Sequence, residues 1–177
     1  ATRQLLNEEP SEARLLLFIL ITNMVFAVSW TIKSILVPTA YVSQYASDDL
    51  GLYVVVLFLM RTAVLYGFAL VVGLLCKFVG SSASLRDIRV GIVWGTFVAA
   101  PFGLLAAILG AAMTTFEVPV PLLSSPIFGL LPYWLGLVPF LWFTAAGAAG
   151  AARSPSALPL FSIMCMATAF FAALSHL

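Results

Sequence analysis

Long apolar runs separated by short polar turns are the feature that most restricts the fold of this chain. Hydrophobic residues make up 63% of it and charged residues 8%, whereas a soluble domain carries about 25% charged residues. The mean hydropathy is +1.12. Too few polar side chains are present to cover a soluble surface, so the sequence predicts an all-α integral membrane protein. The net charge of +1, with no basic face, gives no case for nucleic-acid binding.

The runs divide the chain into a polar arm, residues 1–14, and a five-span transmembrane domain, residues 15–177. A helix needs about 17–25 apolar residues to cross the hydrocarbon core, so each run is interpreted as one span. Ser11 and Glu12 are typical of a helix start, with a frayed arm as the alternative. The predicted spans of the bundle are 15–32, 51–76, 90–113, 122–149 and 157–174.

The fourth run is the least regular, because prolines and glycines interrupt it repeatedly. Broken spans can form substrate sites in transporters, but they then have a matching broken span in the other half. We find no such repeat. We expect a kinked span, or a short outer-surface helix that leads into a span from about Pro132. The interrupting residues are Pro126, Gly129, Pro132, Gly136 and Pro139.

The distribution of charge predicts the orientation in the membrane. With the N-terminus inside, the outer loops hold Lys33 with the acids Asp48, Asp49 and Glu117. The positive-inside rule therefore predicts that the N-terminus lies inside and the C-terminus outside. The cations of the inner segments are Arg3, Arg14, Lys77, Arg86, Arg89 and Arg153.

The third run carries a ladder of small residues at every fourth position, which predicts a helix-packing interface. Small residues allow other helices to approach closely in lipid. Four steps of about 100° overshoot one turn by about 40°, so the ladder winds and the helix should contact more than one neighbour. We predict that Gly95→Leu and Gly103→Leu disrupt assembly more than Leu104→Ala does. The ladder consists of Gly91, Gly95, Ala99, Gly103, Ala107 and Ala111.

Two polar residues of the predicted spans, Arg61 and Asn23, are candidates for a structural or functional role. Arg61 is the one charged residue of the second span and is by default a functional candidate, since a charge in the membrane is costly. Because it lies nearer the outer end of the run, we favour snorkelling, or pairing with Asp48, Asp49 or Glu117. Asn23 is expected to bond to a neighbouring helix.

The sequence contains no recognisable catalytic pattern. It lacks a Gly-rich phosphate loop, a paired His-and-acid spacing and a CxxC motif, and His176 is its one histidine. Cys76 and Cys165 lie in apolar runs and are interpreted as small hydrophobes rather than a disulfide or metal pair. We predict no enzyme, no catalytic residue, no metal and no cofactor, while a bound lipid, quinone or pigment stays open.

A short basic turn follows the second span, and its amino-acid sequence resembles that of a known family. It contains Lys77, Gly80, Arg86, Asp87 and Arg89. The stretch around it is similar to the bacterial Yip1-domain family of five-span membrane proteins. In that family a helix ends in a glycine turn, followed by a Ser and an aromatic or aliphatic residue, and then by a span with Trp and Pro. The similar segments are 66–69, 75–87, 93–95 and 100–101.

The resemblance implies a fold more firmly than an activity. It also implies a location in the bacterial inner membrane, so the N-terminus is expected to be cytoplasmic and the C-terminus periplasmic. The order of spans and turns is similar over residues 5–150, and the amino-acid sequence itself is similar over residues 60–105. The usual Gly-Gly pair of the family is here Gly80-Ser81. Eukaryotic relatives have a longer cytosolic arm with an acidic, Tyr-containing motif linked to Rab GTPases. The arm of this chain has no such motif, so that function is not transferred.

Two classes of function follow from these observations. The first is a Yip1-like accessory or scaffold subunit that packs against other integral membrane proteins, such as a photosynthetic or respiratory complex, or against a second copy, among membrane lipids. The alternative is a small transporter or lipid-handling protein, motivated by Arg61, Pro101 and the broken fourth run. An enzyme acting on lipid is the least favoured, because no catalytic constellation is present.

Overall fold

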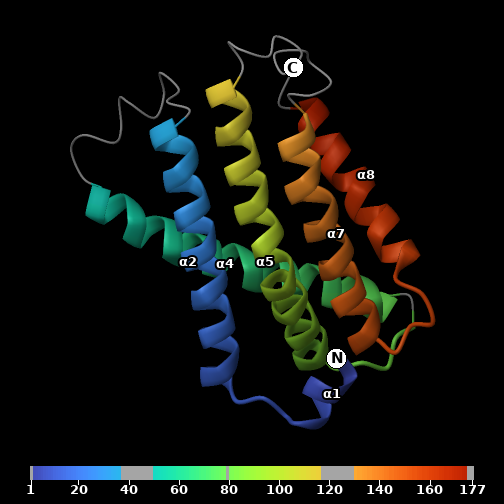
Figure 1. The fold of residues 1–177 in the computed structure, drawn as a ribbon. Helices are drawn as coiled ribbons and strands as arrows, with labels where there is room; N and C mark the ends of the chain where they lie inside the picture. Colours follow the sequence, from blue (N-terminus) through green and yellow to red (C-terminus); the bar gives the residue numbers. More distant parts are fainter. Residues whose placement is uncertain (1, 37–49, 79, 117–129, 175–177) are drawn as a thin grey trace.

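The computed structural model describes residues 2–36, 50–78, 80–116 and 130–174 (Figure 1). Within these ranges all regular structure is helical. Four of the described helices are long and apolar enough to cross a membrane. Their apolar stretches are Glu12–Ile32, Phe58–Phe78, Leu85–Phe116 and Leu131–Ala151. The helices are α1 (Thr2–Asn7), α2 (Glu12–Leu36), α4 (Leu50–Phe78), α5 (Leu85–Phe116), α7 (Leu131–Ala151) and α8 (Leu158–Leu174).

The described part of the chain is therefore all-helical, with four candidate membrane-spanning helices. The fifth predicted span corresponds to α8, an apolar helix of 17 residues. That length gives about 25 Å at about 1.5 Å per residue, which is less than the roughly 30 Å of a hydrocarbon core.

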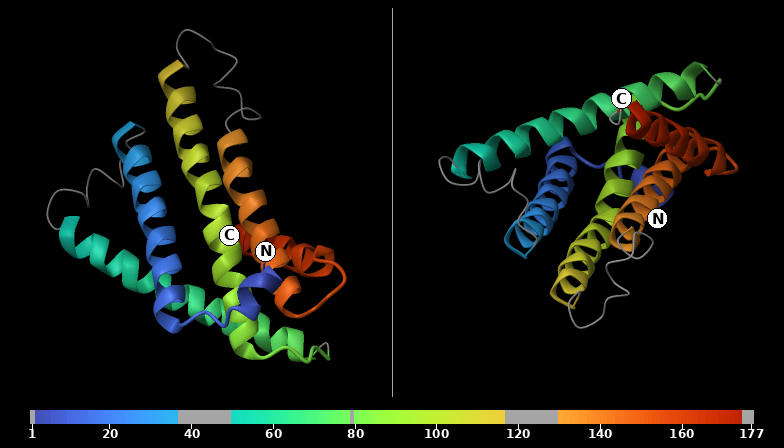
Figure 2. Two further views of the ribbon diagram at one scale, coloured as in Figure 1. Left: turned by 60° about the horizontal axis from the view of Figure 1, so that its bottom comes forward. Right: turned by 90° about the horizontal axis from the view of Figure 1, so that it is seen from above.

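Three long helices run side by side, and one crosses them. In Figure 1, α2, α5 and α7 stand upright with α8 beside α7, whereas α4 passes across them; Figure 2 shows the same crossing from above. The central helix is α5, which contacts α2, α4 and α7. This agrees with the prediction that the helix with the small-residue ladder touches more than one neighbour.

Helix α2 begins where the sequence predicts, and the N-terminal arm before it contains a short helix, α1. At the start of α2, the Arg14 backbone N–H donates to Ser11 Oγ at 3.3 Å, which confirms the predicted helix start. The arm itself contains α1, whose Leu5 is buried among Leu15, Ile19 and Val90. The arm is thus packed onto the bundle, because Leu5 adds to its apolar core.

The last two helices, α7 and α8, cover the predicted fourth and fifth spans. Helix α7 begins at Leu131 with Pro132 in its first turn and continues through Pro139. A start at this point agrees with the alternative of a span from about Pro132. The earlier part of the fourth run, residues 122–129, lies outside the described residues.

Two helices end in the same left-handed turn. After α4, Gly80 has φ +85°, and the Ser81 N–H donates to the Cys76 carbonyl at 2.9 Å. After α7, Arg153 has φ +55°, and the Ser154 N–H donates to the Ala149 carbonyl at 2.9 Å. Glycine suits this conformation because it lacks a Cβ, whereas Arg153 adopts it at a steric cost. Both turns send the chain back along the bundle.

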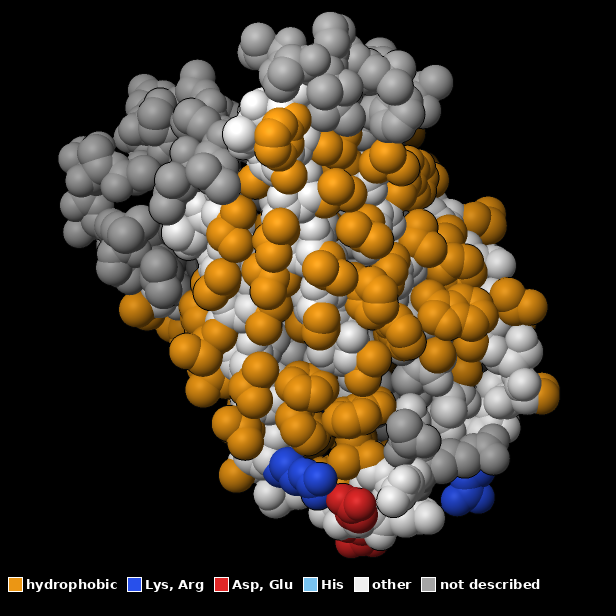
Figure 3. Space-filling model, in the orientation of Figure 1, with side chains coloured by type: hydrophobic (Ala, Val, Ile, Leu, Met, Phe, Trp, Pro, Cys, Tyr) orange, Lys and Arg blue, Asp and Glu red, His pale blue; other side chains and the backbone are white. Residues whose placement is uncertain are grey.

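The N-terminal arm and these two turns meet at one end of the molecule. Ser81 Oγ donates to the Ala152 carbonyl at 3.5 Å, and Arg86 Nη2 donates to the Pro10 carbonyl at 3.3 Å. Figure 3 shows charged side chains of the visible face at its lower end, below a broad apolar surface. We call this the charged end of the bundle.

Candidate functional site

The lower part of the predicted ladder is a backbone-to-backbone crossing between α5 and α7. A Cβ added to Gly91 would lie 2.3 Å from the Gly147 carbonyl oxygen. A Cβ added to Gly95 would lie 2.3 Å from the Phe143 carbonyl oxygen and 2.8 Å from Thr144 Cα. Glycine is required at these positions because any side chain would overlap backbone atoms of the other helix.

Higher up, the contact between α5 and α7 leaves the predicted ladder. Gly136 of α7 faces Ala106 of α5, since a Cβ added to Gly136 would lie 3.3 Å from the Ala106 Cβ. Gly110 of α5 faces Pro132 of α7. Phe102 packs against Phe143, with ring centroids 5.6 Å apart. The contact shifts to these residues because strict four-residue steps wind away from a neighbour at about 3.6 residues per turn.

Gly103 does not lie at a close crossing among the described helices. No atom of the described residues lies within 4 Å of the position that its Cβ would occupy, whereas Ala99, Ala107 and Ala111 are buried. The prediction that Gly103→Leu disrupts assembly therefore does not rest on a contact among the described residues and stays a prediction for contact with another copy or a different protein. Gly95 and Gly103 belong to different surfaces, because only the former meets another backbone.

Arg61 belongs to a polar cluster that joins α4 to α2. Its Nε donates to Asn23 Oδ1 at 3.0 Å, and its Cζ lies 3.8 Å from the centroid of the Phe26 ring. The Asn23 amide donates in turn to Thr62 Oγ1 at 3.0 Å, and the Thr62 hydroxyl donates to the Phe58 carbonyl at 2.8 Å. The expectation that Asn23 bonds to a neighbouring helix is confirmed. This cluster holds a guanidinium in a fixed orientation.

The position of Arg61 along α2 differs from its position along α4. Asn23 is the twelfth of the 25 residues of α2, so Arg61 lies beside the middle of that helix. Within α4, Arg61 is the fourth residue of the apolar stretch Phe58–Phe78. Because α4 crosses the bundle, this position meets the middle of α2 (Figure 1). The expectations that Arg61 lies near the outer end and snorkels, or pairs with a loop acid, stay predictions.

The charge of Arg61 meets no carboxylate among the described residues. The acids in those ranges are Glu8, Glu9, Glu12 and Asp87, and all four belong to the arm or to the first turn of α5. The three acids that the sequence suggested as partners, Asp48, Asp49 and Glu117, lie outside the described residues. Within the described part of the chain, Arg61 is held by neutral groups alone.

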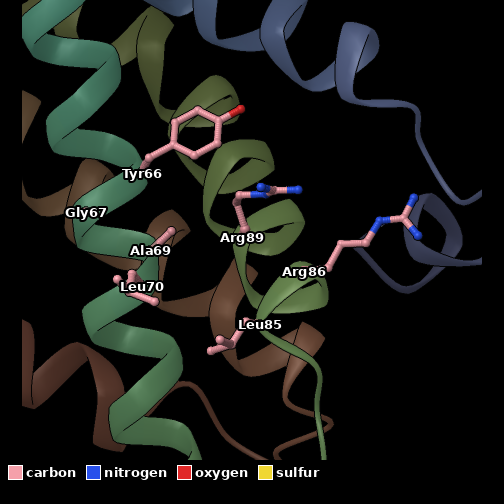
Figure 4. A pocket seen from close by; sticks show the side chains of 7 residues that line it. All are labelled: Tyr66, Gly67, Ala69, Leu70, Leu85, Arg86 and Arg89. Carbon is pink, nitrogen blue, oxygen red and sulfur yellow. The ribbon is translucent and has the colours of Figure 1, made fainter.

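A second site, an open and mainly apolar pocket of about 440 Å³ with two arginines in its lining, lies at the charged end between α4 and the start of α5. In Figure 4, Arg89 lies beside Tyr66, and the Arg86 side chain extends toward the N-terminal arm. The Arg89 Cζ is 5.3 Å from the Tyr66 ring centroid, and its Nη2 pairs with the Glu12 carboxylate. The lining residues are Tyr66, Gly67, Ala69, Leu70, Leu85, Arg86 and Arg89.

The arginines of this pocket keep part of their binding capacity. Arg89 Nε is buried and has no hydrogen-bond partner in the described part of the chain. Arg86 donates to a backbone carbonyl rather than to a carboxylate. Asp87 closes the helix start with Ser84, since each side chain accepts from the other residue's backbone N–H, at 3.2 and 3.0 Å. The pocket is therefore cationic and could hold an anionic group.

The remaining residues of the predicted basic turn lie apart from this pocket. Lys77 is exposed at the last turn of α4, and Gly80 forms the turn that follows. Sequence reasoning named Arg86 and Arg89 but missed Tyr66, because no local pattern shows that α4 crosses the start of α5 at that residue. It also missed Thr62 and Phe26, which reach Arg61 and Asn23 only through the packing of α2 on α4.

Both cysteines are free, with Cys76 buried and Cys165 half-buried, which agrees with their interpretation as small hydrophobes.

Comparisons of this chain with protein-family models, with curated proteins and with solved structures find no match. The function of the chain is therefore inferred from the geometry of the Arg61 cluster, the α5–α7 crossing and the basic pocket.

Proposed function

We propose that this protein is a non-enzymatic accessory or scaffold subunit of the bacterial inner membrane, which packs against other integral membrane proteins. The observation that supports this role is the exposure of α4. Only 17% of its most apolar stretch is buried within the chain, against 39% for α5 and for α7. A long apolar helix that its own chain covers so little offers a large surface for a neighbouring helix.

The surface also includes glycines against which no described residue packs. Gly67 of α4 is exposed, with Ala63 exposed one turn before it, and no described residue lies within 4 Å of the Gly67 Cβ position. Gly103 of α5 is equally open. A glycine inside a helix costs about 1 kcal/mol relative to alanine, and close approach of another helix offsets such a cost in lipid. We assign these glycines to contacts with a partner protein, such as a subunit of a photosynthetic or respiratory complex.

The proposal includes the topology. The N-terminal arm and the turns around Gly80 and Arg153 lie together at the charged end, and we place that end in the cytoplasm by the positive-inside rule. In this arrangement α8 is the fifth span and the C-terminus is periplasmic. Membership of the Yip1-domain family stays a prediction from the sequence similarity of residues 60–105.

Native nanodisc purification followed by mass spectrometry tests the role, with Gly103→Leu as the informative variant. Bulk at this open position should leave the fold of the chain intact but remove the partner, so the co-purified partner should fall about tenfold. Leu104→Ala, which removes bulk from the adjacent position, is the matched control and should retain the partner. A wild-type chain that purifies with lipid alone would contradict the accessory role.

The basic pocket favours a second function, lipid handling. Anionic phospholipids bind to basic pockets between helices at the membrane surface. Here Arg89 and Arg86 are cationic, whereas Leu70, Ala69 and Leu85 provide an apolar wall for the acyl chain. The site is open rather than enclosed, so it suits a lipid that exchanges with the bilayer.

The lipid function predicts that Arg89→Gln lowers the amount of bound anionic phospholipid. A Lys or Arg near the membrane surface contributes about 1 kcal/mol to such binding, so retention should fall about fivefold. Native mass spectrometry of protein in mixed phosphatidylglycerol and phosphatidylethanolamine nanodiscs measures it. Arg153→Gln is the control, because Arg153 is exposed at the same end but does not line the pocket. Equal losses in the two variants would show that the pocket is not a lipid site.

A further inference from the structure

We propose that Arg61 is the docking point for an acidic side chain, Asp or Glu, on a transmembrane helix of a partner protein. This inference rests on the accessory role proposed above and specifies the chemistry of the partner. The residues that carry it are Arg61, Asn23 and Phe26, which form one cluster between α2 and α4.

The cluster orients the guanidinium and leaves one edge of it unused. Nε is engaged by Asn23 Oδ1 at 3.0 Å, and the Phe26 ring lies 3.8 Å from Cζ. The two Nη nitrogens make no hydrogen bond or ion pair with the described residues. Asn23 is buried and also bonded to Thr62, so it cannot turn away. The guanidinium therefore presents a prearranged pair of donors, which matches the two oxygens of a carboxylate.

The location of the cluster favours an opposite charge beside Arg61. Arg61 is the fourth residue of the apolar stretch Phe58–Phe78 of α4 and lies beside the middle of α2, and both helices are candidate spans. Charges within membrane spans are costly and usually pair with one another. The described acids lie at the charged end, with Glu8 bonded to Arg14 and Glu12 to Arg89. Neutral contacts with Asn23 and Phe26 hold the cation in place but do not balance its charge.

The surroundings of Arg61 favour a protein carboxylate over a lipid phosphate. Only 17% of the apolar stretch Phe58–Phe78, which carries Arg61, is buried within the chain, so a second apolar helix can pack along it. An Asp or Glu on such a helix reaches the guanidinium from the side, among apolar side chains. The partner is thus an apolar helix with one acid at the level of Arg61, and the contact forms on the part of α4 that carries Arg61.

A synthetic helix tests the docking chemistry without knowledge of the natural partner. The probe is a fluorescent 21-residue Leu-rich transmembrane peptide with one central Glu, and its matched control has Gln at the same position. Energy transfer to the labelled full chain in phosphatidylcholine vesicles gives the association constant. We expect the Glu peptide to bind the wild type about tenfold more tightly than the Gln peptide. Arg61→Gln should remove this difference, and Arg61→Lys should remove most of it.

Several outcomes would overturn the inference. Equal binding of the Glu and Gln peptides to the wild type would show that Arg61 does not select an acid, and this comparison needs no variant of the chain. Binding of the Glu peptide only after Asp48→Asn, Asp49→Asn and Glu117→Gln together would assign the counter-charge to this chain. Displacement of the peptide by oleate at low mole fraction would assign the site to a fatty-acid carboxylate.

The two proposals can fail separately. If the wild type binds the Glu peptide selectively but purifies without any protein partner, the docking chemistry stands and the accessory role fails. If a stoichiometric partner co-purifies equally with the wild type and with Arg61→Gln, the accessory role stands and the docking inference fails.

Discussion

Gly95→Leu should abolish the folded protein. The Cβ of any residue at this position would lie 2.3 Å from the Phe143 carbonyl oxygen and 2.8 Å from Thr144 Cα. Both atoms belong to the backbone of α7, so a rotamer change cannot relieve the overlap. The helices would have to separate along the contact that joins the two most buried spans. Overpacking ordinarily costs about 1–3 kcal/mol, and a backbone clash should exceed that range.

The measurement is the fraction of protein that remains monodisperse after heating in mild detergent. Gly95→Ala should already lose much of it, because the overlap begins at Cβ. Gly103→Leu is the matched control, since it makes the same change on the same helix where nothing lies within 4 Å. We expect its melting curve to stay close to that of the wild type. Similar losses in Gly95→Leu and Gly103→Leu would show that the α5–α7 contact is not the determinant.

Asn23→Leu should detach α4 from α2. Asn23 is almost fully buried, at 3% exposure, and accepts from Arg61 while donating to Thr62. Leucine fills a similar volume but leaves the guanidinium without its oriented acceptor. A hydrogen bond to a charged group contributes about 1.5–3 kcal/mol, although bonds between membrane helices average less, at about 0.6 kcal/mol. We expect a loss of about 1–3 kcal/mol in the free energy of unfolding.

The local effect can be separated from the global one by amide hydrogen exchange in nanodiscs. Residues 58–66 should exchange faster in Asn23→Leu, because α4 is held to α2 mainly through this cluster. Thr22→Val is the matched control: Thr22 is also buried, at 4% exposure, but its hydroxyl bonds to the Phe18 carbonyl within α2. The control should leave the exchange of α4 unchanged. Equal protection in both variants would contradict a bridging role for Asn23.

Much of the fold follows from local sequence, because lipid solvent and helix capping act locally. Ser11 begins α2 with the expected hydrogen bond, and Gly80 ends α4 with the left-handed turn that only glycine adopts without strain. Helix α7 begins at Leu131, next to the proline that sequence reasoning gave as one starting point. The small residues of α5 likewise indicate a helix with several neighbours, and α5 contacts three long helices.

The functional candidates followed less well from the sequence. Gly91 and Gly95 lie at the α5–α7 crossing, whereas Gly103, on the same predicted ladder, faces open space. The contact continues instead through Ala106 and Gly110. A fixed four-residue period cannot locate this contact, because the drift of the helix face depends on where and at what angle the neighbouring helix crosses.

Arg61 shows the division between sequence and tertiary structure most directly. The sequence by itself determined that the chain is an apolar helical protein and that Arg61 is the one charged residue inside its second apolar run. Only the tertiary structure decided that Arg61 lies beside the middle of α2, with Asn23 and Phe26 as its partners. The physical reason is that hydropathy and capping act along each helix, whereas the depth and partners of a side chain depend on how α4 packs across α2.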